Sequence, residues 1–213
     1  MLTLNHALER LRRDLGDTDS VNALWSSEDL ERHLRHALRE LSEHIPREMK
    51  TVLTTTAGSR DISLPSLTDR IALVAVEWKT GTYPPEYQRF AVWQDTLTVL
   101  VDPAPTTVED VNIYWHALHD INPEGSTIPA WAEDLLILGA VGHAASEAAA
   151  RAINTVNQGG DSVDQQYGAM ARDALQRFRA ELRRRGIKGS VRTFRFFTPA
   201  APMATQDSDP GPP

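Results

Sequence analysis

Histidine and carboxylate side chains are the residues of this 213-residue chain whose types and spacing could support chemistry. Imidazole nitrogens and carboxylate oxygens bind transition metals, and a histidine held by a carboxylate can act as a general base. Three groupings have a suggestive spacing: His33 with His36, His116 with His119, and His143 with Glu147. None of them completes a known metal-binding or catalytic motif.

The expected role of each histidine group is structural. His33 and His36 share a highly charged helical segment without a third ligand nearby, which favours a solvated helix face. His116 and His119 flank the end of a predicted strand, where a hydrogen-bonded loop is the more common arrangement. His143 lies among small residues, and we expect an ion pair within its helix or a hydrogen bond to another helix rather than a catalytic base.

The motifs of common enzyme classes do not occur in the sequence. There is no G-x-S-x-G turn, no phosphate-binding P-loop, no dinucleotide-binding glycine pattern and no H-E-x-x-H. The chain has no cysteine, which excludes disulfides, thiolate metal ligands and a cysteine nucleophile. We therefore expect a protein that is not an enzyme, with no catalytic residue, no metal and no cofactor. A hydrolase using His143 or His116 is the enzymatic alternative.

Helices are predicted at the start of the sequence. Apolar residues at helical spacing predict one helix over 4–15 and another over 27–45. Thr3 and Ser26 are expected as their N-caps, and Trp25 precedes the second helix where a hydrophobic staple residue belongs. These two starts are the best specified local structures in the sequence.

The rest of the sequence predicts a β region followed by two longer helices. From about 50 to 118, short runs of Val, Ile, Thr and aromatic residues alternate with turn residues, which indicates a small antiparallel sheet or sandwich. Helical spacing returns over 128–154 and 161–186, which predicts a helical hairpin, and Gly186 is expected to end its second helix. The segment after Lys188 has a strand-like pattern.

These elements predict an α+β, mainly α fold. It is expected to be a helical bundle, made of two N-terminal helices plus a long C-terminal helical hairpin, with an inserted small antiparallel β subdomain and an extended C-terminal tail. The predicted regions are 1–48 for the N-terminal helices, 49–121 for the β insert, 122–187 for the hairpin and 188–213 for an extended or disordered tail.

The first helix of the predicted hairpin consists largely of small residues. Between positions 139 and 152, ten of the fourteen residues are Gly, Ala or Ser, so other backbones can approach this helix closely. Charged residues interrupt the apolar run before it reaches the roughly 18 residues that a membrane span needs. We therefore expect protein around this helix rather than lipid.

The net charge of −7 is unevenly distributed. Residues 172–195 carry nine Lys or Arg and two Asp or Glu, so this segment is basic while the rest of the chain is acidic. Basic and aromatic side chains here could line a phosphate path or form a protein interface, and a solvated helix face is equally compatible. The candidates are Arg183, Arg184, Arg185, Lys188, Arg192, Phe194, Arg195, Phe196 and Phe197.

Three segments and the order of the elements resemble the head-to-tail connector, or adaptor, proteins of tailed double-stranded DNA bacteriophages. The segments are WSSEDLERHLRHALRELSEHIP at 25–46, YWHALHDINPEGSTIPAWAEDLLILGAVGHAASEAA at 114–149 and DQQYGAMARDALQRFRAEL at 164–182. Together with the intervening β region, the resemblance covers roughly residues 1–186.

The resemblance implies a structural virion protein, made in the host cytoplasm and located in the neck at the head-to-tail junction. It implies a ring, usually of twelve copies, under the portal protein and above a head-closure or tail protein. Such a ring extends the channel for double-stranded DNA without sequence-specific binding and without a membrane. The basic and aromatic candidates would contact the portal or another partner, and packing between subunits would involve Gly139, Gly142, Ala145 and Ala149.

Two alternatives share parts of this pattern. One is another neck component, such as a head-closure or tail-completion protein. The other is a DNA-binding accessory protein that uses the arginines at 183–185, whose affinity would fall with salt. The acidic balance of the whole chain opposes free DNA binding.

Overall fold

The computed structural model describes residues 2–19, 21–83, 85–152 and 163–196, with side chains up to residue 186. The chain divides into two compact units. A helical unit consists of Met1–Arg47 and Leu118–Gly186, and a second unit includes Glu48–Ala117, which holds every strand residue except Arg47.

The first two helices begin where capping residues predict. Helix α1 (Leu4–Leu15) follows the N-cap Thr3 and ends at Gly16, whose φ of 70° lies in the left-handed region that favours glycine. Helix α2 (Ser27–His44) follows Ser26, whose side chain accepts a hydrogen bond from a backbone N–H of the first turn. Because these hydrogen bonds are local, the sequence alone predicts both starts, and the structure confirms them.

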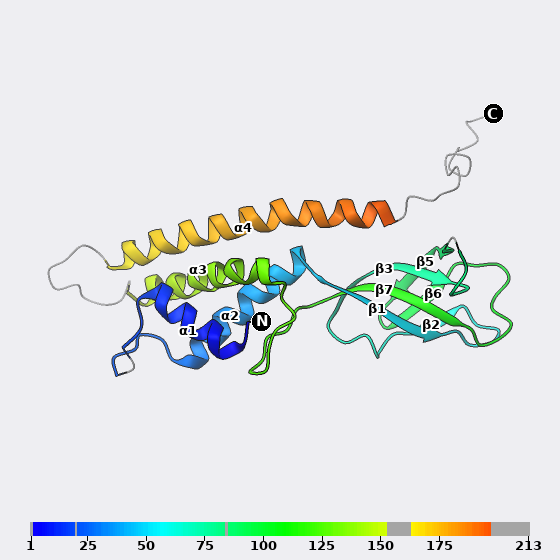
Figure 1. Ribbon diagram of the computed structural model, residues 1–213, viewed down its shortest axis with the longest axis horizontal. Coiled ribbons are helices and arrows are strands. Elements are labelled where there is room, and N and C mark those ends of the chain that lie inside the picture. Colours follow the sequence, from blue (N-terminus) through cyan, green and yellow to red (C-terminus); the bar gives the residue numbers. More distant parts are fainter. Residues whose placement is uncertain (1, 20, 84, 153–162, 197–213) are drawn as a thin grey trace, which may run out of the picture. The chain divides into compact units, whose positions relative to one another are not determined.

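Two further helices complete the helical unit (Figure 1). A short 3-10 turn, η1 (Ala130–Ala132), leads into α3 (Glu133–Ala152), and α4 (Val163–Phe196) runs along α3. Leu136 of α3 and Phe178 of α4 are both fully buried. The core of this unit therefore lies between α3 and its neighbours. The core residues with no exposed surface are Ala7, Leu11, Leu30, Leu34, Ala37, Leu41, Ile121, Ala132, Leu136, Ala140, Ala144, Phe178 and Leu182.

Two antiparallel sheets form the second unit (Figure 1). The four-stranded sheet has the order β1-β7-β3-β4 and the three-stranded sheet has the order β2-β6-β5. The strands are β1 (Arg47–Thr54), β2 (Asp61–Ser63), β3 (Arg70–Trp78), β4 (Tyr87–Gln88), β5 (Phe90–Trp93), β6 (Thr96–Val99) and β7 (Asp110–Ala117). Residues from both sheets share one core, which includes Ile62, Val76, Leu97, Val111 and Ile113.

The predicted fold class, a mainly α-helical bundle with a small β insert, is wrong. Among the described residues there are four α-helices and seven strands, and the strands form two sheets with their own hydrophobic core. The helical part is therefore not a bundle dominated by a long C-terminal hairpin, and residues 153–162, which would form the hairpin turn, lie outside the described residues. Short strands such as β4 carry little sequence periodicity, because their stability comes from pairing with neighbours.

The predicted extended tail after Lys188 is also corrected. Helix α4 passes through Gly186 and continues to Phe196, while residues 197–213 lie outside the described residues. Adding a residue to an existing helix gains one hydrogen bond without a new nucleus, so this segment extends the helix despite its strand-like pattern. A Cβ on Gly186 would lie 3.2 Å from the carbonyl oxygen of His44, so this glycine permits a close helix approach instead of ending α4.

Among the described helices, none combines the length and apolar character that crossing a bilayer requires.

Candidate functional site

The small residues of α3 bring α4 close to it within one chain. A Cβ on Gly139 would lie 2.8 Å from Cζ of Phe178, and a Cβ on Gly142 would lie 2.7 Å from Cγ of Leu175. Real Cβ atoms do not approach other carbon atoms this closely, so only glycine fits at either position. The two glycines therefore serve packing inside the helical unit.

The other two predicted packing residues have different surroundings. Ala145 is fully buried in the helical unit, whereas Ala149 is only half-buried. Packing between subunits stays a prediction for all four residues, and Ala149 has the most accessible surface among them.

Two of the arginines at 183–185 of α4 make ion pairs within the subunit. Arg184 Nη2 lies 2.7 Å from Glu181 Oε2, and Arg185 Nε lies 3.3 Å from the same oxygen. The guanidinium of Arg185 also stacks 4.6 Å from the ring centroid of Trp131, a cation–π contact. Arg183 is exposed and donates only a 3.2 Å hydrogen bond to the carbonyl of Arg179 among the interactions described for it.

The remaining basic and aromatic candidates lie farther along the chain. Residues 188, 192, 194, 195 and 196 belong to α4, but their side chains lie outside the described part, and Phe197 lies outside the described residues altogether. Their contact with a partner stays a prediction.

His33 is buried, contrary to the solvated helix face predicted for it. Its Nε2 lies 2.6 Å from Glu147 Oε2, and Arg32 Nη2 lies 2.6 Å from the same carboxylate oxygen. Arg151 pairs with Glu147 from within α3. The Glu147 carboxylate therefore joins α2 to α3, and burial lowers the pKa of His33.

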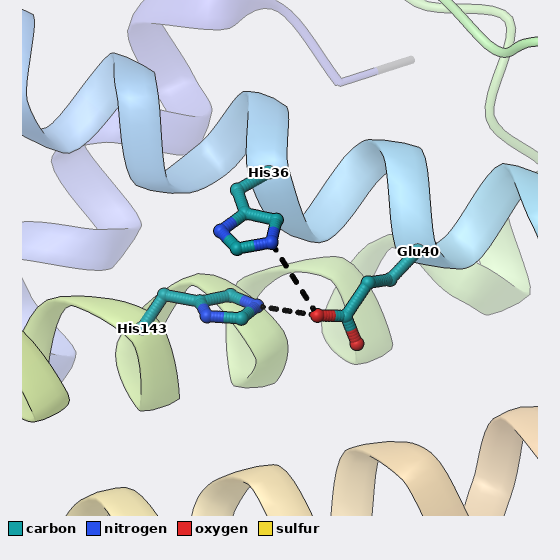
Figure 2. Close-up of side chains that lie close together, drawn as sticks. All are labelled: His36, Glu40 and His143. Atoms are coloured by element: carbon teal, nitrogen blue, oxygen red, sulfur yellow. Dashed lines mark ion pairs between the residues drawn. The ribbon is translucent and has the colours of Figure 1, made fainter.

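His36, Glu40 and His143 form a second cluster between the same helices (Figure 2). His36 Nε2 lies 3.6 Å and His143 Nε2 lies 3.2 Å from Glu40 Oε1, and the two imidazole rings stack with their centroids 4.0 Å apart. Arg179 of α4 contacts the carboxylate as well, with Nε 3.3 Å from Oε2. His143 therefore contacts another helix through Glu40, but its Nε2 makes no hydrogen bond there, so the contact is not the interhelical hydrogen bond that the sequence predicts.

The surroundings of the cluster shift the pKa values of His143 and Glu40. Burial, together with electrostatic repulsion from His36, lowers the pKa of His143 to about 4, so its imidazole is neutral at pH 7. Burial acts to raise the pKa of Glu40, but the hydrogen bond from Arg179 and the nearby positive charges outweigh it and lower that pKa. A neutral imidazole thus faces an ionised carboxylate.

Sequence reasoning missed two members of this cluster. Glu40 follows His36 by four residues, a spacing that places both on one helix face and that could have marked it. Arg179 is separated from Glu40 by more than a hundred residues, and nothing local links them. His143 meets them only through the packing of α3 on α2.

His119 occupies a hydrogen-bonded loop, as predicted. Its Nδ1 lies 3.1 Å from the hydroxyl of Thr127 and its Nε2 lies 3.0 Å from the carbonyl oxygen of Ile45. A neutral ring that donates from Nε2 to the carbonyl and accepts at Nδ1 satisfies both contacts. His116 lies in β7, where burial lowers its pKa.

We expect acid to destabilise the protein through His119. Burial lowers the pKa of His119 below its ordinary value of 6.5, so the unfolded state takes up a proton first as the pH falls. Its contribution to stability is complete above pH 6.5 and is lost as the pH falls toward the folded-state pKa. One such group contributes a slope of at most about 1.4 kcal/mol per pH unit.

Urea unfolding between pH 7.5 and 5 measures this slope. The variant His119→Gln keeps an amide that can donate to the Ile45 carbonyl but cannot titrate. Its stability should fall less steeply with acid than that of the wild type. Parallel curves for the two proteins would show that His119 does not carry the effect.

The structure thus defines a two-unit α+β protein, in which a closely packed helical unit and a unit of two sheets each have their own core. The chain belongs to the SU10 adaptor protein family, whose model matches residues 2–195. This match confirms the resemblance to phage head-to-tail adaptors. The protein is accordingly a phage adaptor and a structural protein of the virion that interacts with other virion components. No curated protein sequence matches the chain.

Proposed function

We propose that the protein assembles into a ring, of about twelve copies if it follows the arrangement that the resemblance implies, under the portal protein at the head-to-tail junction. The observation that carries this proposal is the family match over residues 2–195, which spans both units. The ring would extend the DNA channel and join the head to a head-closure or tail protein. Its lumen would pass DNA without reading the sequence.

A closed ring requires two different surfaces on each subunit, because every copy contacts one neighbour on each side. Large apolar side chains that are exposed in the single chain are candidates for these surfaces. In the sheet unit, Trp93 is 80% exposed and Tyr83 is 96% exposed, and in the helical unit Trp131 is 51% exposed. Aromatic side chains are enriched in interfaces, which supports a role for these residues in assembly.

The C-terminal part of α4 is the proposed contact with the portal. The family match includes the helix to residue 195, so the basic end belongs to the part of the chain that the family shares. Arg184 and Arg185 form ion pairs with Glu181 within the subunit. We therefore propose that residues beyond 186 make most of the contact with the portal.

Deleting residues 191–213 should leave a folded subunit that no longer joins portal-bearing heads. The deletion removes the last turn and a half of α4 and leaves the described core side chains in place. We expect the joining of heads to fall about tenfold or more. A tenfold fall corresponds to a loss of roughly 1.4 kcal/mol of binding free energy. Complementation of adaptor-deficient heads, scored by electron microscopy, measures it, and circular dichroism checks the fold.

A shorter deletion, of residues 197–213, is the matched control. It keeps α4 and the whole family match, so most of the joining should remain. Unimpaired joining by the chain that lacks 191–213 would remove the portal contact from this segment. Gold labelling of the protein in intact particles tests the neck location separately, and label away from the head-to-tail junction would contradict the proposed function as a whole.

A further inference from the structure

We propose that His36, Glu40 and His143 bind a divalent transition-metal ion, with Zn²⁺ as the best fit, and that the ion links α2 to α3. The three side chains come from facing positions of two packed helices, and their ligand atoms all lie within 4.8 Å of one another (Figure 2). Two imidazoles and one carboxylate are a ligand set that binds zinc and leaves a fourth position for water.

The distances in the cluster match the spacing of ligands around such an ion. Ligand atoms about 2.1 Å from a tetrahedral ion lie roughly 3.4 Å from one another. Glu40 Oε1 lies 3.2 Å from Nε2 of His143 and 3.6 Å from Nε2 of His36. Each of these two separations therefore differs from the expected spacing by only about 0.2 Å.

An unsatisfied nitrogen also points to a bound cation. His143 is 9% exposed, and its Nε2 is buried without a hydrogen bond among the described residues, although it lies 3.2 Å from the Glu40 carboxylate. A cation bound between this nitrogen and the Glu40 carboxylate would give the buried Nε2 a partner.

Two adjustments must accompany binding. The imidazole rings are stacked at an interplanar angle of 16°, so one ring must turn before both lone pairs can point at one ion. The side chain of His36 is 58% exposed and is free to make that turn. Arg179 must release Oε1 of Glu40, while its contact with Oε2 can orient the carboxylate as outer-shell partners of metal sites do.

Zinc titration of the full chain tests the proposal. The protein should carry no affinity tag of histidines, and it should be stripped of metal with a chelator before calorimetry at pH 7.5. We expect one Zn²⁺ per chain and a rise in the thermal midpoint on binding, because an ion that binds only the folded state stabilises it. Co²⁺ in place of Zn²⁺ should give the visible absorption of a four-coordinate site.

The variant His36→Ala is the decisive comparison, because an exposed side chain can be removed without loss of the fold. Its zinc affinity should fall by more than the roughly 10–100-fold that follows removal of an outer-shell partner. His6→Ala removes an exposed histidine of α1 and should bind zinc as the wild type does. His143→Gln should also lose binding, provided that circular dichroism shows it folded.

Several results would overturn the proposal. They are the absence of saturable Zn²⁺ binding by the wild type, an unchanged affinity of His36→Ala, and an equal loss of affinity in His6→Ala. None of these results bears on the ring or on the portal contact, since head joining is measured by a different assay.

Discussion

Replacing Phe178 by alanine should lower the free energy of unfolding by about 3–5 kcal/mol, the range for removal of a buried aromatic ring. Phe178 has no exposed surface, and its ring lies against the backbone of Gly139. The glycine has no side chain that could fill the vacated space, so most of the cavity should persist. Urea unfolding followed by circular dichroism, extrapolated linearly to water, measures the change.

A double-mutant cycle tests whether the glycine and the ring depend on each other. Gly139→Ala alone places a methyl group 2.8 Å from the ring position, and overpacking of this kind costs about 1–3 kcal/mol. In a Phe178→Leu background the same alanine meets a smaller side chain, so its cost should shrink or change sign. Strictly additive free energies would show that the two residues do not make the close contact described.

Gly142→Val should be at least as damaging as the alanine at 139, with an expected loss of about 3 kcal/mol or more. The added Cβ would lie 2.7 Å from Leu175 Cγ and 3.2 Å from the backbone nitrogen of Leu175. A side chain can rotate away from a methyl group, but a backbone nitrogen cannot, so α4 must move away from α3. The thermal midpoint and the urea midpoint should fall together.

Gly168→Ala is a matched control for this prediction. Gly168 also lies inside a helix, but the nearest atom to an added Cβ is Arg172 Nη1, at 3.9 Å. Without a clash, the helix propensity of alanine should stabilise the protein by up to about 1 kcal/mol. If both substitutions stabilise the protein, the close approach of α4 to α3 at Gly142 is incorrect.

The sequence predicts best those features whose cause lies within a few residues. Ser26 and the three residues that follow it contain all the atoms of the N-cap hydrogen bond of α2. At the end of α1, Gly16 itself adopts the left-handed backbone conformation that ends the helix. The family resemblance was equally accessible, because it rests on whole segments rather than on one contact.

Features that depend on contacts between distant residues were predicted poorly. The burial of His33 depends on Glu147, more than a hundred positions later, so its charged neighbours in the sequence suggested a solvated face instead. The sheet unit forms a larger part of the fold than the sequence predicts. Strands of two or three residues, such as β4 and β2, are too short to show the alternation of apolar and polar residues that marks a strand. Gly186 was misassigned as a helix end because the His44 carbonyl that requires it lies on α2.

The strands that lead into and out of the sheet unit are neighbours in one sheet. The chain leaves the helical unit at the start of β1 and returns to it after β7, and these two strands pair side by side. Adjacent strands lie about 4.8 Å apart, so the two connections between the sheet unit and the helical unit lie close together. A change in the length of the sheet unit between these two strands would therefore leave the distance between its two connections to the helical unit unchanged.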